Sequence, residues 1–457
     1  MFHGFFRKIG ELKTTKKTHI KKVDYTRLFS LAVIVVLIVF FLSSCLGQSK
    51  DIISELQNIP GVVIQEMEPD APIFQSKYEI KLIQPRDHEN PEAGFFQQRM
   101  FLSHADFNKP MVLVTEGYTA GKNYVQELAE ILGANELRVE YRYFGESKPD
   151  AIDWTFLNNN QSSHDYHRIY SLFKSFYKKR WVSTGWSKGG QTSLIYRRHF
   201  PDDMTAVIVY DAPVNLALEE PRIDEFFEQV GDELCRHRLI VFQRSILRSK
   251  NDILPLYKTY CEEKEYTFEK ITPLKAFEYT VLEYPFSFWQ YHTLDCSMIP
   301  EERATPQEMF EHLKQVVSLS SYSDRAFNST AMKQFATELG YYRYVTKNVI
   351  DLLNEGKDDY PNNAFGPEDA DLTFDPTFME DINKWLMTQG NNVIYIYGES
   401  DPWSAPRLEY LGATNAKMFW VKNGNHYSFI RTLSETQQDE LLQTLEDWLG
   451  ITIERQK

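Results

Sequence analysis

A glycine-bracketed serine between a predicted strand and a predicted helix is the feature that most constrains this chain. The stretch "WVSTGWSKGGQTSLIYRRHF" runs from Trp181 to Phe200 and contains the pattern G-x-S-x-G around Ser187. Apolar residues precede the serine, and helix formers follow it until Pro201. In a strand–turn–helix, this pattern lifts the hydroxyl above a sheet on a strained turn, as a nucleophile requires. The alternative is a plain strand-to-helix turn with a small residue.

The residues around the serine suit a nucleophile. Gly185 and Gly189 have no Cβ atoms that would collide where the strand and the helix pass closely. The amide of Lys188, at the start of the helix, would point to where an oxyanion forms. A second donor is expected from the loop after the predicted strand Met111–Thr115, and the Tyr118 amide is the candidate.

A serine nucleophile needs a histidine base and a carboxylate that holds the imidazole tautomer. Asp401 follows a predicted strand at Val393–Tyr397, and His426 follows one at Met418–Val421. Ser187, Asp401 and His426 thus appear in the serine–acid–histidine order of an α/β-hydrolase, each after a strand. The sequence therefore predicts a catalytic triad.

Each of these assignments has an alternative. Asp401 could be a turn residue, and His426 could only cap its loop. Asp211 and Glu399 are rival acids, although Asp211 follows an earlier strand, which is a less usual position for the acid.

Neither the histidines nor the cysteines predict a metal site. His164 and His167 are close enough to suggest ligands, but they lie in a helix with an aromatic face, where structural roles fit better. Cys235, Cys261 and Cys296 form no paired CxxC pattern, and their odd number leaves at least one unpaired. Cys235 and Cys261 could bridge two helices. No metal or cofactor is expected.

The chain of 457 residues is long enough for one large domain with an insertion. Strands alternate with helices before residue 214 and after residue 372, which predicts a mostly parallel sheet covered on both faces. Between these limits, helical periodicity with many aromatic residues predicts a helical cap. The expected parts are a signal peptide (1–44), a linker with a short helix or strand (45–74), the first part of the core (75–213), the cap (214–372) and the second part of the core (373–457).

Several further elements are predicted within these parts. A hairpin starts near Tyr78 and turns at 85–91, and a strand spans Leu137–Tyr141. A helix capped by Ser162 or Ser163 follows. The last helix is expected to begin with a capping box of Ser434 and Gln437 and to end at Leu449, before Gly450.

The N-terminus differs in charge from the rest of the chain. The formal net charge is −14, which argues against a nucleic-acid partner, yet residues 1–44 carry eight Lys or Arg and two acids. The apolar run Leu28–Leu42 is 15 residues long, whereas a spanning helix needs roughly 20. It therefore fits a signal peptide.

The segment Leu42–Cys45 resembles a bacterial lipoprotein cleavage box, with Cys45 as the lipidated first residue of the mature chain. The alternative is an uncleaved anchor with a chance cysteine. In both cases the body is expected outside the cytoplasm, on the periplasmic or the cell-surface face of the envelope.

Several motifs resemble the secreted bacterial tripeptidyl aminopeptidases, a serine peptidase family of the α/β-hydrolase clan related to lysosomal Pro-Xaa carboxypeptidase. They include "TEGY", "VEYRYFGESKP", "RWVSTGWSKGGQTSLIYRRHFPDD", "GESDPWSAP" and "NHYSFI", and the resemblance covers about residues 75–450. It implies Ser187 as nucleophile, Asp401 as acid and His426 as base. It also implies release of tripeptides from free N-termini, often after proline or another small or apolar residue. Tyr141 and Trp186 depart from the residues common in relatives, which puts the subsite preference in question.

An exopeptidase also needs a carboxylate for the substrate ammonium and a wall that ends its cleft. Glu116, Glu140 and acids of the cap are the candidates, and the sequence does not choose among them. The expected partners are peptide substrates and, through the lipid anchor, a membrane. An esterase or lipase on the same fold and a non-catalytic peptide-binding lipoprotein are the competing functions.

Overall fold

A computed structural model describes the chain at residues 52–122, 124–291, 295–327, 329–357, 362–409, 412 and 414–455. The described residues fall into two units, with the division between Glu55 and Leu56. The helix α2 (Ile52–Gln57) begins in the first unit, and the elements after it belong to the second. The predicted signal peptide and Cys45 lie outside the described residues. Within those residues, no helix is both long and apolar enough to cross a membrane.

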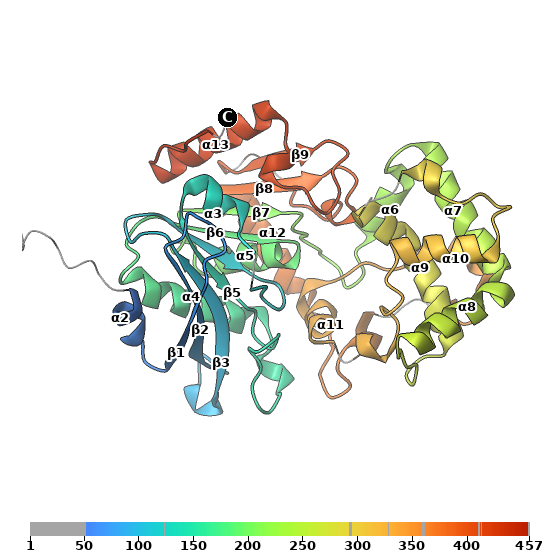
Figure 1. The fold of residues 1–457 in the computed structure, drawn as a ribbon, viewed down its shortest axis with the longest axis horizontal. Helices are drawn as coiled ribbons and strands as arrows, with labels where there is room; N and C mark the ends of the chain where they lie inside the picture. The colour runs from blue at the N-terminus through green and yellow to red at the C-terminus, as the bar shows by residue number, and fades with distance from the viewer. Residues whose placement is uncertain are drawn as a thin grey trace, which may run out of the picture. The chain divides into compact units, whose positions relative to one another are not determined.

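A nine-stranded sheet with the order β1-β2-β3-β5-β4-β6-β7-β8-β9 forms the centre of the second unit (Figure 1). Strands β1, β2, β3 and β5 pair antiparallel, and from β5 to β9 every pair is parallel. The strands are β1 (Val62–Met67), β2 (Ser76–Pro85), β3 (Phe95–His104), β4 (Met111–Thr115), β5 (Asn135–Val139), β6 (Trp181–Trp186), β7 (Ala206–Tyr210), β8 (Val393–Gly398) and β9 (Lys417–Val421).

Helices cover both faces of the parallel part of the sheet. On one face, α3 (Glu127–Leu132) and α13 (Glu435–Leu449) pack in a cluster that includes Val182 of β6. The next residue, Ser183, hydrogen-bonds Ser193 of α5 (Lys188–His199) at 2.7 Å. Because alternate side chains of a strand point to opposite faces, α5 lies on the other face. Helices α4 (Asn159–Lys174) and α12 (Pro376–Gln389) pack beside it. Burial on both faces explains why these strands read as continuous apolar runs.

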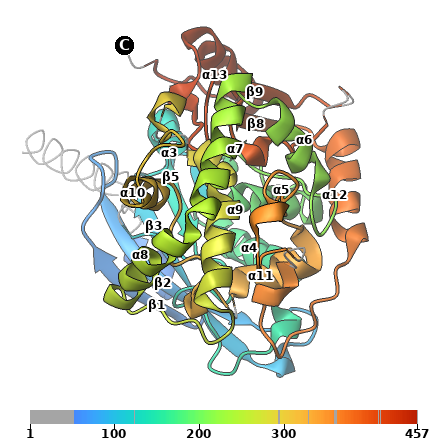
Figure 2. The same ribbon diagram turned by 90° about the vertical axis from the view of Figure 1, so that its right-hand side faces the viewer.

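The described residues between β7 and α12 form helices and loops, without a strand. The α-helices of this segment are α6 (Pro221–Gln229), α7 (Glu233–Arg248), α8 (Lys250–Glu263), α9 (Pro273–Tyr291), α10 (Pro306–Val316) and α11 (Thr330–Gln334). These helices have their own aromatic core, with Phe242, Phe277 and Tyr284 among its buried residues. Figure 2 shows α9 running lengthwise among α7, α8 and α10.

The long helix α9 contains Pro285 in its interior. A proline has no N–H for the carbonyl four residues earlier, which is that of Val281. The side-chain amide of Gln243 in α7 donates to that carbonyl at 2.8 Å. The neighbouring helix thus supplies the hydrogen bond that the proline removes, and α9 continues to Tyr291.

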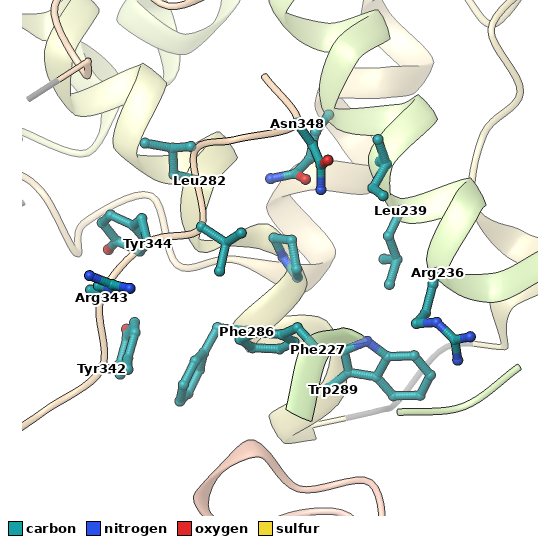
Figure 3. Close-up of a pocket in the computed structure, with 14 residues that line it drawn as sticks. Phe227, Arg236, Leu239, Leu282, Phe286, Trp289, Tyr342, Arg343, Tyr344 and Asn348 are labelled. Carbon is teal, nitrogen blue, oxygen red and sulfur yellow. The ribbon is translucent and has the colours of Figure 1, made fainter. Parts of the chain in front are cut away.

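One side of α9 faces a small cavity of about 70 Å³. Leu282, Phe286 and Trp289 of α9 line it together with residues of α7 and the loop at Tyr342 and Tyr344 (Figure 3). A space of this size holds a few water molecules and no peptide.

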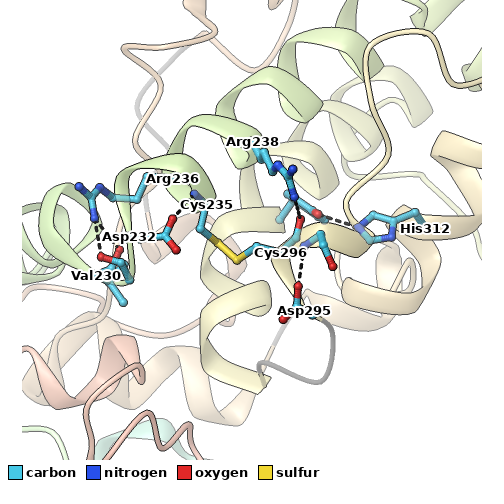
Figure 4. The surroundings of a disulfide bond; sticks show 11 residues. Val230, Asp232, Cys235, Arg236, Arg238, Asp295, Cys296 and His312 are labelled. Carbon is cyan, nitrogen blue, oxygen red and sulfur yellow. Dashed lines mark hydrogen bonds between the residues drawn. A yellow bond between two sulfur atoms is a disulfide. The ribbon is translucent and has the colours of Figure 1, made fainter.

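A disulfide joins Cys235 of α7 to Cys296, which follows α9, with a Cα–Cα distance of 5.4 Å (Figure 4). The bridge between Cys235 and Cys261, which the sequence left open, therefore does not form. The reason is that α7 packs against α9 and the turn that follows it, which brings the third cysteine to Cys235. Cys261 is a buried free thiol, and burial raises its pKa to about 11.

The predicted fold class, an α/β-hydrolase sheet with helices on both faces, is confirmed. The strand Met111–Thr115 and the Ser434–Gln437 capping box are as predicted. The strand expected at Leu137–Tyr141 lies two residues earlier, and Asn158 caps α4 in place of Ser162 or Ser163. In the segment expected to be a linker, β1 pairs with β2 and so extends the sheet.

Candidate active site

Ser187 lies on the turn between β6 and α5. Its φ is +55°, in a region that residues other than glycine rarely adopt. Gly185 and Gly189 allow this turn, because a Cβ atom on Gly185 would collide with Gly189 and one on Gly189 with the carbonyl of Thr115. The strained strand–turn–helix geometry that the sequence predicts is therefore present.

The position of Ser187 in the sheet is that of a ligand-binding crevice. From β4 the chain goes first to the neighbour on one side, β5, and then to the neighbour on the other side, β6. Loops at the carboxyl ends of such strands separate and leave a crevice at the switch point. Ser187 follows β6 and Tyr118 follows β4, so the two predicted site residues lie on the two sides of this crevice.

His426 and Asp401 form a buried pair. The Nδ1 atom of His426 lies 2.7 Å from Oδ2 of Asp401. Asp401 follows β8 and His426 follows β9, and these neighbouring strands bring the two loops together. A carboxylate in this position fixes the Nδ1–H tautomer of the imidazole and leaves Nε2 free to accept a proton.

The loop of His426 is held from two sides, and sequence reasoning missed both contacts. The indole Nε1 of Trp186 donates to the His426 carbonyl at 2.6 Å. The His426 amide donates to the carbonyl of Gln290, at the end of α9, at 2.9 Å. Backbone acceptors of this kind leave no signal in a sequence.

The rival acid Asp211 lies beside Asp401. One oxygen of Asp211, one oxygen of Asp401 and one ring nitrogen of His426 all lie within 4.8 Å of one another, a spacing that could hold a metal ion. Asp211 instead accepts hydrogen bonds from the amides of Gly398 and Ser428, at 2.9 and 3.2 Å. Burial, and next the charge of Asp401, raise the pKa of Asp211 well above its usual range. Asp211 is thus bound by backbone amides beside the acid that contacts the histidine.

The other alternative residues are engaged elsewhere. Glu399 accepts the amide of Asn423 at 3.0 Å. His164 donates from Nδ1 to the Asn160 carbonyl at 2.9 Å, and His167 lies 2.7 Å from a carboxylate oxygen of Asp203. These contacts agree with structural roles for the two histidines.

A cavity of about 1020 Å³ opens above Ser187. Its lining includes Ser187, His426 and Tyr118 from the sheet side, and Glu283 and Tyr342 from the helical segment. Ligand cavities are typically about 300–1,000 Å³, so this one has room for several residues of a peptide. Aromatic side chains supply much of its wall.

Lys188 contacts the loop that carries the second predicted oxyanion donor. Its Nζ donates to the Gly117 carbonyl at 2.7 Å and lies 3.9 Å from the centre of the Tyr141 ring. The Gly117 carbonyl and the Tyr118 N–H belong to one trans peptide unit and point in opposite directions. Holding the carbonyl therefore fixes the direction of the Tyr118 amide. Burial lowers the pKa of the Lys188 ammonium to about 7.

The two glutamates predicted to bind a substrate amine have different surroundings. Glu116 lines the cavity, and its Oε1 pairs with Arg138 at 2.9 Å. Glu140 is fully buried and pairs with Arg99, and its carboxylate also accepts three backbone amides and a serine hydroxyl. Its carboxylate is saturated by these partners, and Glu140 does not line the cavity.

This chain is similar to known peptidases over most of its length. Residues 47–457 match the family model described as PS-10 peptidase S37. The prolyl tri/tetrapeptidyl aminopeptidase of Streptomyces mobaraensis is 31% identical over 420 residues, which cover 90% of this chain and 87% of that protein. An Arabidopsis thaliana protein named "Probable serine protease EDA2" is 23% identical over 195 residues, 38% of this chain and 39% of that protein. Among solved structures, the proline iminopeptidase of Mycobacterium smegmatis has 12% identity and a TM-score of 0.40, and the match covers 81% of this chain and 97% of that chain.

Proposed function

The chain belongs to the S37 family of peptidases, and from that premise we propose that it is a serine aminopeptidase that releases tripeptides from free N-termini. The observation that carries the proposal is the His426–Asp401 pair at 2.7 Å, with His426 and the strained Ser187 lining one cavity of peptide size. The similar Streptomyces protein is a prolyl tri/tetrapeptidyl aminopeptidase. This similarity supports cleavage after a proline in the third position from the N-terminus. Such a substrate is therefore the first one to test.

In the proposed mechanism, Ser187 is the nucleophile. Its Oγ attacks the carbonyl carbon of the scissile peptide bond while Nε2 of His426 takes its proton. Asp401 keeps the imidazole in the required tautomer and stabilises the imidazolium that forms. The C–N bond then breaks, and His426 gives its proton to the leaving amine. The N-terminal fragment stays on Ser187 as an ester, which water hydrolyses with His426 again as base.

The amides of Lys188 and Tyr118 are the proposed donors to the oxyanion. Lys188 is the first residue of α5, so its N–H has no partner within the helix. Preorganised donors of this kind stabilise the negative charge that develops on the carbonyl oxygen. The contact between Lys188 Nζ and the Gly117 carbonyl connects the two donors.

We assign residues 214–372 to a cap that closes the cavity from the side opposite Ser187. Glu283, Ser287 and several tyrosines of this segment line the cavity, so it supplies the wall that an exopeptidase needs. An esterase or lipase would use the same triad. Membership of a peptidase family favours peptides as substrates.

The decisive experiment compares Ala-Ala-Pro-p-nitroanilide bearing a free amine with its N-acetylated counterpart. Residues 46–457 and the Ser187→Ala variant are assayed with both substrates. We expect the parent to hydrolyse the free-amine substrate and the variant to lose that activity by a factor of about 10⁴ or more. The acetylated substrate should be a poor one, because it has no ammonium.

Each other outcome has its own meaning. Equal hydrolysis of both substrates would show an endopeptidase or a broad hydrolase and overturn the exopeptidase proposal. Hydrolysis of p-nitrophenyl esters without any hydrolysis of the anilides would favour an esterase. Binding of peptides without turnover would favour a peptide-binding lipoprotein.

We also propose that Cys45 is lipidated and anchors the protein in the cell envelope. The support is the sequence alone: a basic arm, an apolar run and a cleavage box before Cys45. Two acyl chains suffice for stable anchoring. In a bacterial host that lipidates such boxes, the full-length chain should sediment with membranes, and a Cys45→Ser variant should not carry labelled palmitate. Equal labelling of both would refute the proposal.

A further inference from the structure

A single acidic residue of α9 faces the cavity together with three other residues of the same helix. Glu283, Ser287, Gln290 and Tyr291 all line the cavity that contains Ser187. Their spacing of four, three and one residues puts them on one side of the helix. An adjacent side of the helix, with Leu282, Phe286 and Trp289, faces the small cavity of Figure 3. Helix α9 therefore presents a carboxylate to the space where a peptide would bind.

Hydroxyl groups surround the Glu283 carboxylate. Its Oε2 accepts from the hydroxyl of Tyr342 at 2.6 Å, of Tyr322 at 3.1 Å and of Tyr344 at 3.2 Å. Its Oε1 accepts only from the Ser287 hydroxyl, at 2.7 Å, among the described residues. A carboxylate oxygen can accept more than one hydrogen bond, so Oε1 retains capacity for a donor in the cavity.

Among the described residues, Glu283 lacks the cation that several other glutamates beside the site or on α9 have. Glu116 pairs with Arg138, Glu140 with Arg99, and Glu278, on the same helix, with Lys250. No salt bridge to Glu283 occurs among the described residues. Burial raises the pKa of Glu283, and only hydroxyl groups oppose that effect among its main influences. A buried carboxylate without a counter-ion is costly, and such a site has affinity for a cation.

We propose that Glu283 binds the α-ammonium group of the substrate peptide, an inference that rests on the proposed aminopeptidase function. An ammonium brings the missing positive charge and up to three N–H donors, and Oε1 can accept one of them. The rings of Tyr341 and Tyr342 also line the cavity, and aromatic faces favour cations. An N-acylated terminus has neither the charge nor the donors, so Glu283 would exclude it.

The position of Glu283 on α9 agrees with the proposed release of tripeptides. The carbonyl of Gln290, seven residues later, binds the amide of His426. Seven residues of α-helix rise about 10 Å, and three residues of extended peptide span about 10 Å. Helix α9 thus holds the ammonium site and the histidine loop apart by roughly the length of a tripeptide.

The test uses Glu283→Gln, which keeps the size of the side chain and an acceptor for the tyrosines but removes the charge. We expect kcat/KM for free-amine Ala-Ala-Pro-p-nitroanilide to fall about 10–100-fold, mostly through KM, because charged hydrogen bonds are lost. Activity on the acetylated substrate should stay unchanged. The ratio of kcat/KM for the tripeptidyl anilide to kcat/KM for Ala-Pro-p-nitroanilide and for Ala-Ala-Ala-Pro-p-nitroanilide should decrease.

Glu278→Gln is the matched control, because Glu278 is a buried carboxylate of the same helix outside the cavity. It should leave the ratio of free-amine to acetylated activity at the parent value. If the parent discriminates and Glu283→Gln discriminates equally, the inference is wrong while the aminopeptidase function stands. If the parent itself does not discriminate, both fall.

A second variant decides the question if Glu283→Gln does not fold. Glu283→Asp keeps the charge and withdraws the carboxylate by one methylene. We expect a higher KM for the free-amine tripeptidyl substrate with kcat within about threefold of the parent, since the reacting groups are untouched. An unchanged KM would overturn the inference.

Discussion

At the scale of single residues, Lys188 shows how the backbone and the side chain of one residue can serve two parts of a site. Its backbone amide is one proposed oxyanion donor, and its ammonium holds the carbonyl of Gly117, whose peptide unit carries the other. The sequence predicts the first role from the motif. The second depends on a contact across 71 residues of chain, which no local pattern encodes.

We therefore expect Lys188→Met to slow catalysis. Methionine fills the buried space but cannot donate to the Gly117 carbonyl, so the Tyr118 amide loses its fixed direction. Loss of a whole oxyanion donor costs about 10²–10³ in kcat, and a loosened donor should cost about 10–100-fold. Steady-state kinetics with the tripeptidyl anilide should show this in kcat, with KM nearly constant. An unchanged kcat would refute the role.

Lys333→Met is the control for this prediction. Lys333 is also buried, donates to a backbone carbonyl (that of Leu157, at 2.9 Å) and has a pKa that burial lowers, but it does not line the cavity. Its substitution should leave kcat at the parent level. Both substitutions should change how stability depends on pH, because both remove a buried amino group whose pKa folding lowers.

The direction of that stability effect follows from the pKa of Lys188. Folding lowers it from 10.5 to about 7. Between these values the unfolded chain holds a proton that the folded chain has released, so parent stability rises with pH across this window. Lys188→Met lacks this rise. Its melting temperature relative to the parent should therefore be highest near pH 6 to 7 and decline towards pH 10.

At the scale of elements, α9 brings together features that are separate in the sequence. It carries Glu283 on its cavity side, supports the loop of His426 through Gln290, and leads to the disulfide at Cys296. Gln243 of α7 completes its hydrogen bonding at Pro285. The helix therefore supports the proposed site and is also part of the proposed cap.

We expect the disulfide to contribute strongly to stability. It closes a loop with a sequence separation of 61 residues, and a loop of this length corresponds to about 4 kcal/mol in the chain-entropy treatment. In urea denaturation, a reductant should lower the free energy of unfolding by about 2–4 kcal/mol in the parent and in Cys261→Ser. The double variant Cys235→Ser, Cys296→Ser should not respond to reductant. A parent that does not respond either would contradict the pairing.

At the scale of the whole molecule, the sheet order explains why distant segments meet. Ser187, Asp401 and His426 follow β6, β8 and β9, and all three loops emerge at the carboxyl edge of parallel strands. The helical segment, inserted between β7 and β8, supplies the other side of the cavity. The proposed reaction and its proposed selectivity thus come from two parts of the chain that fold around different cores.

The sequence by itself determined the strands, the glycine-lined turn at Ser187 and the order of serine, acid and histidine, because local patterns of glycine and apolar residues encode them. Only the tertiary structure decided the partner of Cys235, the position of Asp211 beside Asp401, and the absence of a cation beside Glu283 among the described residues. In the sequence, Glu278 and Glu283 are two similar acids in an apolar helix. In the part of the chain that the structure describes, Lys250 lies beside Glu278, whereas hydroxyl groups bind Glu283. Packing between distant segments sets such neighbours.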